Sequence, residues 1–342
     1  MIQWFMVGLL SLGLVGCASS TQGPPSQSAA PAEQRSAMPR QSKEWLARLN
    51  AYRQTAGLSA IKEDSPLSNG DFKHSRYLVK NQMVDPGLGA RMHDEDPDNP
   101  WYTPEGRQAG QTSDVIPPSR AGLSDDEAID GWLSAPFHAL PMLDPDLQQA
   151  GYGSFCENGL CAATLNVGRD ERWARDAARR RLHFDPERQA HDNPNVYFVA
   201  PPERRFPTPI EFPPDGFTIT KSRFEGNEWP NPLAACPGYT PPTGFPVVVS
   251  FGSSFVPEVT DHSIKRDSEA LEHCLVSADT YSNTDESQQR AARDSLRLYG
   301  AVFLIARDPF VPGSTYTVSV ARDRQVYSWS FKVASKEPLV AK

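Results

Sequence analysis

The sequence lacks several features that would identify common classes of protein. Its 34 basic and 42 acidic residues form no strong block of one sign and give a formal net charge of −8, which argues against a nucleic-acid partner. The apolar run at residues 4–16 is too short to span a membrane as a helix. No G-x-S-x-G sequence occurs, which excludes the nucleophile elbow of a serine hydrolase.

Composition favours a globular protein with many turns. The apolar fraction of 39% is enough to build hydrophobic cores, and 342 residues leave room for about two domains. The 32 prolines indicate many irregular connections between short elements.

The N-terminus predicts where the protein resides. Residues 1–16 form an apolar leader that ends in Leu14-Val15-Gly16 before Cys17, and this run resembles a lipobox, the signal for acylation and cleavage of bacterial lipoproteins. An ordinary secretory leader or a short buried helix are the alternatives, and the first three residues carry none of the usual basic side chains. An acylated Cys17 would hold the chain on a membrane of the cell envelope. Because Ala18 follows the cysteine, we expect the outer membrane where the bacterium has one.

The segment after the cysteine predicts a tether. Residues 17–43 are rich in Pro, Ser, Gln and Ala and show no apolar periodicity, which is typical of disordered linkers.

With Cys17 acylated, an even set of four cysteines remains. In an exported chain this set favours two disulfides, for which three pairings exist. Cys156 and Cys161 flank an Asn-Gly turn and would staple a short hairpin, leaving Cys236 and Cys274 to close a longer loop. A zinc site is disfavoured because no C-x-x-C pair occurs.

Residues 44–168 predict a layered α+β domain. Apolar side chains recur at helical spacing from Glu44 to a stop at Gly57, and again over residues 66–82. A Pro/Gly/Asp-rich loop is expected over residues 85–118, followed by a helix that begins near Ser124 and stops at Pro136. Two strands, at about residues 150–155 and 161–167, complete the domain.

The second half of the chain predicts an all-β domain. Residues 169–195 form a charged segment that we interpret as a solvated linker. Short runs rich in β-branched and aromatic residues then alternate with Pro/Gly turns over residues 196–335, which is typical of an immunoglobulin-like β-sandwich. Residues 279–294 are polar and predict a loop or short helix, and residues 336–342 a tail.

Several short motifs in the first domain resemble those of the CAP superfamily, the SCP-like extracellular domains. Residues 49–53 (Leu-Asn-Ala-Tyr-Arg) and 57–58 (Gly-Leu) match the opening of such a domain. Residues 132–138 (Trp-Leu-Ser-Ala-Pro-Phe-His) resemble its bacterial W-x-x-S-P-x-H-R motif, and Gly151-Tyr152-Gly153 its following strand. The resemblance implies a CAP-type α-β-α sandwich.

The resemblance also implies a cleft. Members of the family commonly place two histidines and two glutamates there, and some bind a divalent metal. By order along the chain, His93 and His138 match the histidines, Gln111 stands where the first glutamate would, and Ala135 where the second would. A divalent metal such as zinc held by His93 and His138 would therefore lack the family's carboxylates. Asp94, Glu95 or Asp96 would supply an acid only if their loop folds inward.

Other polar residues are interpreted as structural. His74 is expected to be a structural residue of its helix, and residues 228–230 to order a loop between strands.

Taken together, these features predict a lipid-anchored protein that binds rather than catalyses. A small hydrophobic ligand or an envelope component would occupy the cleft around His93, Gln111 and His138, and the β-sandwich would serve as spacer or adhesion surface. The alternatives are a metal-dependent hydrolase using the two histidines, acting on protein or cell wall, and a purely structural envelope protein.

Overall fold

The four-stranded sheet of the first half sits between two layers of helices. The computed structural model describes residues 43–84, 91–120, 122–168 and 204–335. The predicted signal peptide, tether, linker and tail lie outside these residues, apart from Lys43. The described residues group into one compact unit, and no helix among them has the length and apolarity needed to cross a membrane.

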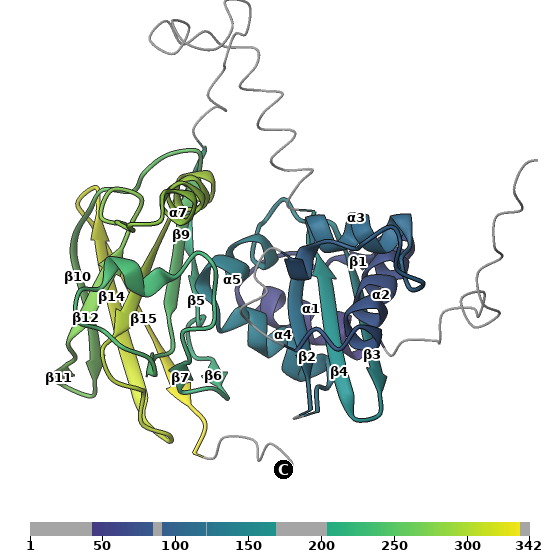
Figure 1. Ribbon diagram of the computed structural model, residues 1–342. Coiled ribbons are helices and arrows are strands. Elements are labelled where there is room, and N and C mark those ends of the chain that lie inside the picture. The colour runs from purple at the N-terminus through teal and green to yellow at the C-terminus, as the bar shows by residue number, and fades with distance from the viewer. Residues whose placement is uncertain (1–42, 85–90, 121, 169–203, 336–342) are drawn as a thin grey trace, which may run out of the picture. The chain divides into compact units, whose positions relative to one another are not determined.

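The sheet has the strand order β1-β3-β4-β2 (Figure 1). It comprises β1 (Lys62–Glu63), β2 (Asp114–Ser119), β3 (Gln149–Glu157) and β4 (Leu160–Asn166). The predicted hairpin is β3 and β4, and Asn158 and Gly159 both take positive φ at its turn, as a tight hairpin turn requires. This register sets Cys156 directly opposite Cys161, and the two form the predicted disulfide.

Helices cover both faces of this sheet, as predicted. Because side chains alternate along a strand, the fully buried β4 contributes to two cores. Ala162 packs with Leu78 of α2 (Ser65–Lys80), which is joined on that face by α3 (Pro104–Thr112). Ala163 belongs to the other core, with Trp45 of α1 (Glu44–Thr55). The helices α4 (Asp125–Leu133) and α5 (Pro136–Met142) contribute to the same core.

Two glycines of β3 allow α2 to lie close against the sheet. A Cβ atom at Gly153 would overlap the backbone of Phe72, and one at Gly151 would overlap the side chain of Leu67. The Gly-x-Gly sequence therefore has a packing role, because only residues without a side chain permit this approach.

The helix ends follow from the local sequence. The Asp64 carboxylate accepts a hydrogen bond from the backbone N–H of Leu67 at the start of α2. Ser124 and Glu127 form a capping box at the start of α4, which confirms the predicted helix start.

Several elements of the first half were not predicted, among them α3, β2 and α5. The supposed loop at residues 85–118 contains α3 and most of β2. Helix α3 has few apolar residues and so no apolar period, but Thr103 caps it and Pro104 begins it. Pro136 likewise begins a new helix, α5, after ending the previous one.

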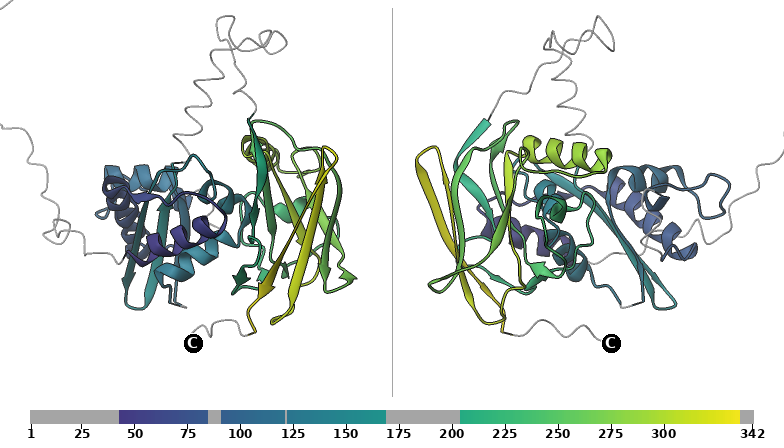
Figure 2. Two further views of the ribbon diagram at one scale, coloured as in Figure 1. Left: turned by 180° about the vertical axis from the view of Figure 1, so that it is seen from behind. Right: turned by 60° about the vertical axis from the view of Figure 1, so that its left-hand side comes forward.

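The second half is rich in β-structure, as predicted, and forms two main open sheets (Figures 1 and 2). One has the order β11-β10-β14-β15-β6 and the other β12-β13-β9-β5, and two short strands, β7 and β8, pair separately. The first sheet comprises β6 (Thr218–Ile219), β10 (Val259–Arg266), β11 (Glu269–Ala270), β14 (Thr315–Arg322) and β15 (Gln325–Val333). The second comprises β5 (Arg204–Phe212), β9 (Val247–Ser253), β12 (His273–Val276) and β13 (Ala301–Ala306). The short pair is β7 (Arg223–Phe224) and β8 (Thr243–Gly244).

Strands β5 and β10 carry polar or irregular sequences, so no simple alternation of apolar and polar residues marks them. The polar segment at residues 279–294 contains most of a helix, α7 (Glu286–Leu298), which buries Ala292 and Leu296. Figure 2 shows α7 as the one helix drawn in light green, beside the strands.

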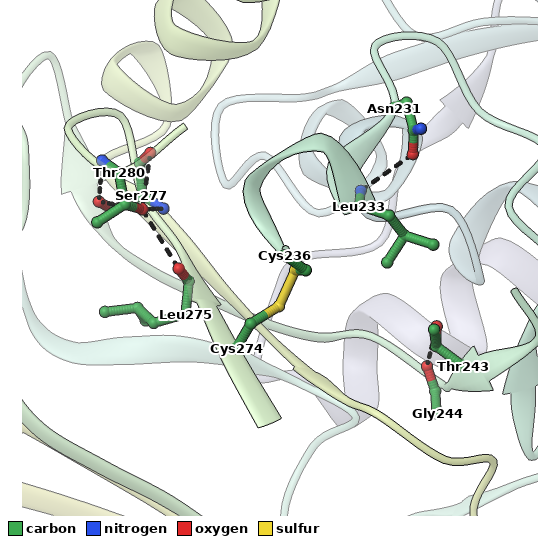
Figure 3. Close-up of a disulfide and its surroundings, with 9 residues drawn as sticks. All are labelled: Asn231, Leu233, Cys236, Thr243, Gly244, Cys274, Leu275, Ser277 and Thr280. Carbon is green, nitrogen blue, oxygen red and sulfur yellow. Dashed lines mark hydrogen bonds between the residues drawn. A yellow bond between two sulfur atoms is a disulfide. The ribbon is translucent and has the colours of Figure 1, made fainter. Parts of the chain in front are cut away.

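The second predicted disulfide is also present. Cys236 follows a short 3-10 helix, η3 (Pro232–Ala235), and bonds to Cys274 of β12 (Figure 3). The bond closes a loop with a sequence separation of 38, whereas the separation in the first disulfide is 5.

Buried side chains from both halves of the chain belong to one hydrophobic cluster. The ring of Tyr52 in α1 lies 5.7 Å from that of Phe212 in β5. The ring of Phe137 in α5 lies 5.0 Å from Phe303 in β13 and 6.2 Å from Tyr281. The strands after residue 204 therefore help to bury the helices α1 and α5.

Candidate functional site

His138 lies at the N-terminus of α5, where a carboxylate from the second half of the chain binds it. One oxygen of Glu228 accepts from the backbone N–H of His138 at 3.0 Å and faces its ring Nδ1 at 2.8 Å. The backbone N–H of Phe137 adds a further bond to the same carboxylate. Ala135, at the N-cap, has no side chain that could accept these bonds. Glu228 therefore caps the helix from 90 residues away.

A second carboxylate lies on the other side of the ring. Asp114, at the start of β2, has an oxygen 3.7 Å from Nε2 of His138. The Asp114 side chain is buried, as is that of Glu228, whereas the His138 side chain is 20% exposed. Burial raises the pKa of Glu228, while its bonds from His138 act in the opposite direction. His138 is thus the partly exposed member of a group whose two carboxyl side chains are buried.

The opposite end of α5 is held by a buried guanidinium. Arg53 of α1 is fully buried and donates to the carbonyls of Met142 at 2.7 Å and Asp144 at 3.0 Å. It also donates to Ser59 and Leu147. Burial lowers the pKa of Arg53 to about 10. A carboxylate at the N-terminus and a guanidinium at the C-terminus both match the helix dipole.

His93 and Gln111 lie where a 3-10 turn meets α3. The Nδ1 atom of His93 donates to the carbonyl of Gly110 at 2.8 Å. The Gln111 amide donates to Asp94 at 3.1 Å, and Arg107 donates to the same carboxylate at 2.7 Å. The hydrogen bond from Arg107 lowers the pKa of Asp94. Both predicted residues are therefore engaged in contacts within this corner of the fold.

The segment at residues 110–114 connects the two predicted histidines. His93 bonds to its first residue, Gly110, and His138 lies near its last, Asp114. Ser113, which immediately precedes Asp114, donates a hydrogen bond to the buried carboxylate of Asp71 at 2.9 Å. Burial raises the pKa of Asp71 well above its ordinary value.

The site was expected to lack the family's two carboxylates. Two other acidic residues take their place beside His138, and their positions along the chain did not indicate this. Positions 111 and 135 carry no acid, yet Asp114 and Glu228 face the imidazole of His138. Asp114 lies only three residues after Gln111 and was overlooked because it starts a strand that was not predicted. No local pattern marks Glu228, since its partner is 90 residues away.

The loop acids considered from sequence are engaged elsewhere. Asp94 binds Arg107, and the backbone N–H of Asp96 donates to the hydroxyl of Tyr77. Glu95 lies 3.0 Å from Nδ1 of His74, and both side chains are fully buried. The other ring nitrogen of His74 lies 2.8 Å from the Met92 carbonyl. These contacts confirm the structural role predicted for His74.

The residues present do not fit a metal centre with three protein ligands. In the part of the chain that the structure describes, no three His, Cys, Asp or Glu side chains gather as a group that could hold a metal ion. Nδ1 of His93 is directed at a carbonyl and Nδ1 of His138 at Glu228. A metal shared by these two histidines remains a prediction.

Two small cavities border the helices α1 and α5. One, lined by residues that include Leu140, Leu143 and Tyr299, has a volume of about 10 Å³. The other, lined by residues that include Tyr52 and Phe212, is about as small. Each has room for about one water molecule. Neither is lined by His93, Gln111 or His138.

The comparison with known families agrees with this fold. Residues 46–165 match the model of the cysteine-rich secretory protein family, CAP. The match spans the helices and strands of the first sheet, from α1 into β4. No curated protein matches the sequence.

Proposed function

We propose that this protein, which carries an extracellular-type CAP domain at residues 46–165, is a lipid-anchored component of a bacterial cell envelope that acts by binding a macromolecular partner. It works without catalysis, and its second half is part of the same structural unit as the CAP domain.

The observation that carries the proposal is the bonding of His138. Its Nδ1 and its backbone N–H are both bound to Glu228, and this carboxylate also caps α5. In this arrangement the most reactive side chains of the site join two segments of the chain. Residues used in this way serve the stability of the fold.

The hydrogen bonds of His93 and Gln111 support the same proposal, a binding function without catalysis. Both side chains are engaged in the 3-10 turn and α3, with Gly110 and Asp94 as partners. Neither of the two cavities described above has room for a small ligand, which favours a partner that contacts the surface.

The anchor rests on the sequence alone. Cys17 follows a lipobox-like run and precedes a tether of about twenty residues, which would separate the folded part from the membrane. Substituting Cys17→Ser should move the protein from the membrane fraction to the soluble fraction. A variant retained on the membrane would contradict lipidation at this residue.

A second candidate function is hydrolysis, and one contact favours it. A histidine whose Nδ1 is held by a buried carboxylate can present Nε2 as a general base, and His138 is partly exposed. This is the alternative reaction class for the two histidines, acting on protein or cell-wall substrates.

One experiment separates the two functions. The purified full chain is incubated with protein and cell-wall substrates, beside His138→Gln and His93→Gln variants, with metal content measured in each. We expect no turnover by any of the three, and no metal content that depends on His93 or His138. Turnover by the wild type that is lost in a folded His138→Gln variant would overturn the binding proposal.

A further inference from the structure

A pair of histidines far along the chain from the CAP motifs joins the two sheets of the second half. His262 belongs to β10 and His273 to β12, which lie in different sheets. Nδ1 of His262 lies 2.9 Å from Nε2 of His273. The rings cross at 80°, with centroids 5.0 Å apart. Ile264, two residues after His262, is fully buried, so alternation places His262 on the inner face of β10.

The bonding of His273 fixes which of its nitrogens carries a lone pair. Its Nδ1 lies 2.7 Å from the carbonyl oxygen of Leu271. A carbonyl only accepts, so Nδ1 carries the proton and Nε2 is free of one when the ring is neutral. That lone pair points toward His262. A backbone carbonyl that orients the second nitrogen is a common support for a histidine that binds a metal.

Both histidines stand on backbone that is held in place. Cys274, the next residue after His273, is bonded to Cys236, which ties β12 to η3 (Figure 3). On the other side, His262 is paired with Val320 of β14 within a long antiparallel ladder. The two nitrogens are therefore positioned by a disulfide and by a sheet. Rigid support of this kind favours a preformed binding site.

We propose that His262 and His273 bind a divalent copper ion as two neighbouring nitrogen ligands. Imidazole nitrogens lie about 2.0–2.1 Å from such ions, and ligands at about 90° are then about 2.9 Å apart. The observed separation is 2.9 Å. Among first-row divalent ions copper binds nitrogen sites most tightly and accepts this angle.

Binding needs no net loss of a proton from the pair. The proton on Nδ1 of His262 moves to its Nε2, through solvent, and the freed Nδ1 binds the ion. Within the described residues no third His, Cys, Asp or Glu side chain joins such a group, so water completes the coordination. Burial, together with the neighbouring His273, lowers the pKa of His262, while the exposed Asp261 carboxylate acts in the opposite direction. Glu272 is paired with Arg307.

The test is a titration of the metal-free full chain with Cu²⁺, followed by electron paramagnetic resonance and by NMR of the histidine ring nitrogens. We expect a bound ion with two nitrogen ligands and metal-dependent loss of the His262 and His273 ring signals. His262→Gln and His273→Gln should each weaken binding at least about tenfold. Thermal unfolding of the metal-free variants confirms that they are folded.

His93→Gln and His138→Gln are the matched controls and should bind copper like the wild type. Copper binding that is unchanged in both His262 and His273 variants would overturn the proposal. Loss of binding in the His93 or His138 variants alone would also overturn it, and would instead place a metal in the candidate site, against the proposed function. Ring signals of His262 and His273 that persist at saturating copper would also overturn it.

Discussion

The bond between Glu228 and the start of α5 predicts a measurable loss of stability. The substitution Glu228→Ala removes the acceptor of the backbone N–H of His138 and of its ring. A lost helix cap costs about 1 kcal/mol, and a lost hydrogen bond to a charged group about 2 kcal/mol. The burial that raises the pKa of Glu228 offsets part of this cost. We expect the free energy of unfolding to fall by about 2–3 kcal/mol.

The measurement is chemical denaturation of the full chain at neutral pH, with Glu225→Ala as the matched control. Glu225 lies three residues earlier, is exposed and pairs with Arg223, so its removal should cost less than about 0.5 kcal/mol. Glu228→Gln keeps an oxygen acceptor without the charge and should fall between the two. The reasoning is refuted if Glu228→Ala and Glu225→Ala unfold at the same denaturant concentration.

Two further predictions concern the disulfides and the pH dependence of stability. Replacing Cys236 and Cys274 together by serine should lower the free energy of unfolding by about 4 kcal/mol. The same change at Cys156 and Cys161 should lower it by about 2 kcal/mol, because the second bond closes a much shorter loop; equal losses in denaturation curves would contradict this. Burial raises the pKa of Glu211 to about 7, so its folded state holds a proton that the unfolded state loses above pH 4.5, and stability should fall as pH rises from about 4.5 to 7. Glu211→Gln should therefore stabilise the protein more at pH 8 than at pH 5, and a thermal-unfolding difference that is independent of pH would count against it.

Much of the first half could be predicted because its signals are local. Ser124 and Glu127 lie three residues apart and define a helix start by themselves. Cys156 and Cys161 flank a tight turn, which places them directly opposite each other in the hairpin. The Gly-x-Gly of β3 marks a close approach, although only the structure shows that α2 makes it.

The remainder depends on contacts between distant residues. Helix α3 carries no apolar period, because it presents Gly106 and Gly110 to a buried Glu95 and His74. The acids of the candidate site were likewise not predicted, because their contacts with His138 join residues far apart in the sequence. Nothing near Glu228 in the sequence indicates that it binds a helix 90 residues earlier.

The capping of α5 at both ends has a consequence for how the protein can be divided. A helix of seven residues gains too little from its own hydrogen bonds to persist alone in water. Its N-terminus relies on Glu228 and its C-terminus on Arg53. The CAP domain is therefore not an interchangeable module here. Residues 44–168 transplanted into another protein would lack Glu228. The N-terminus of α5, where His138 lies, would then lose its cap.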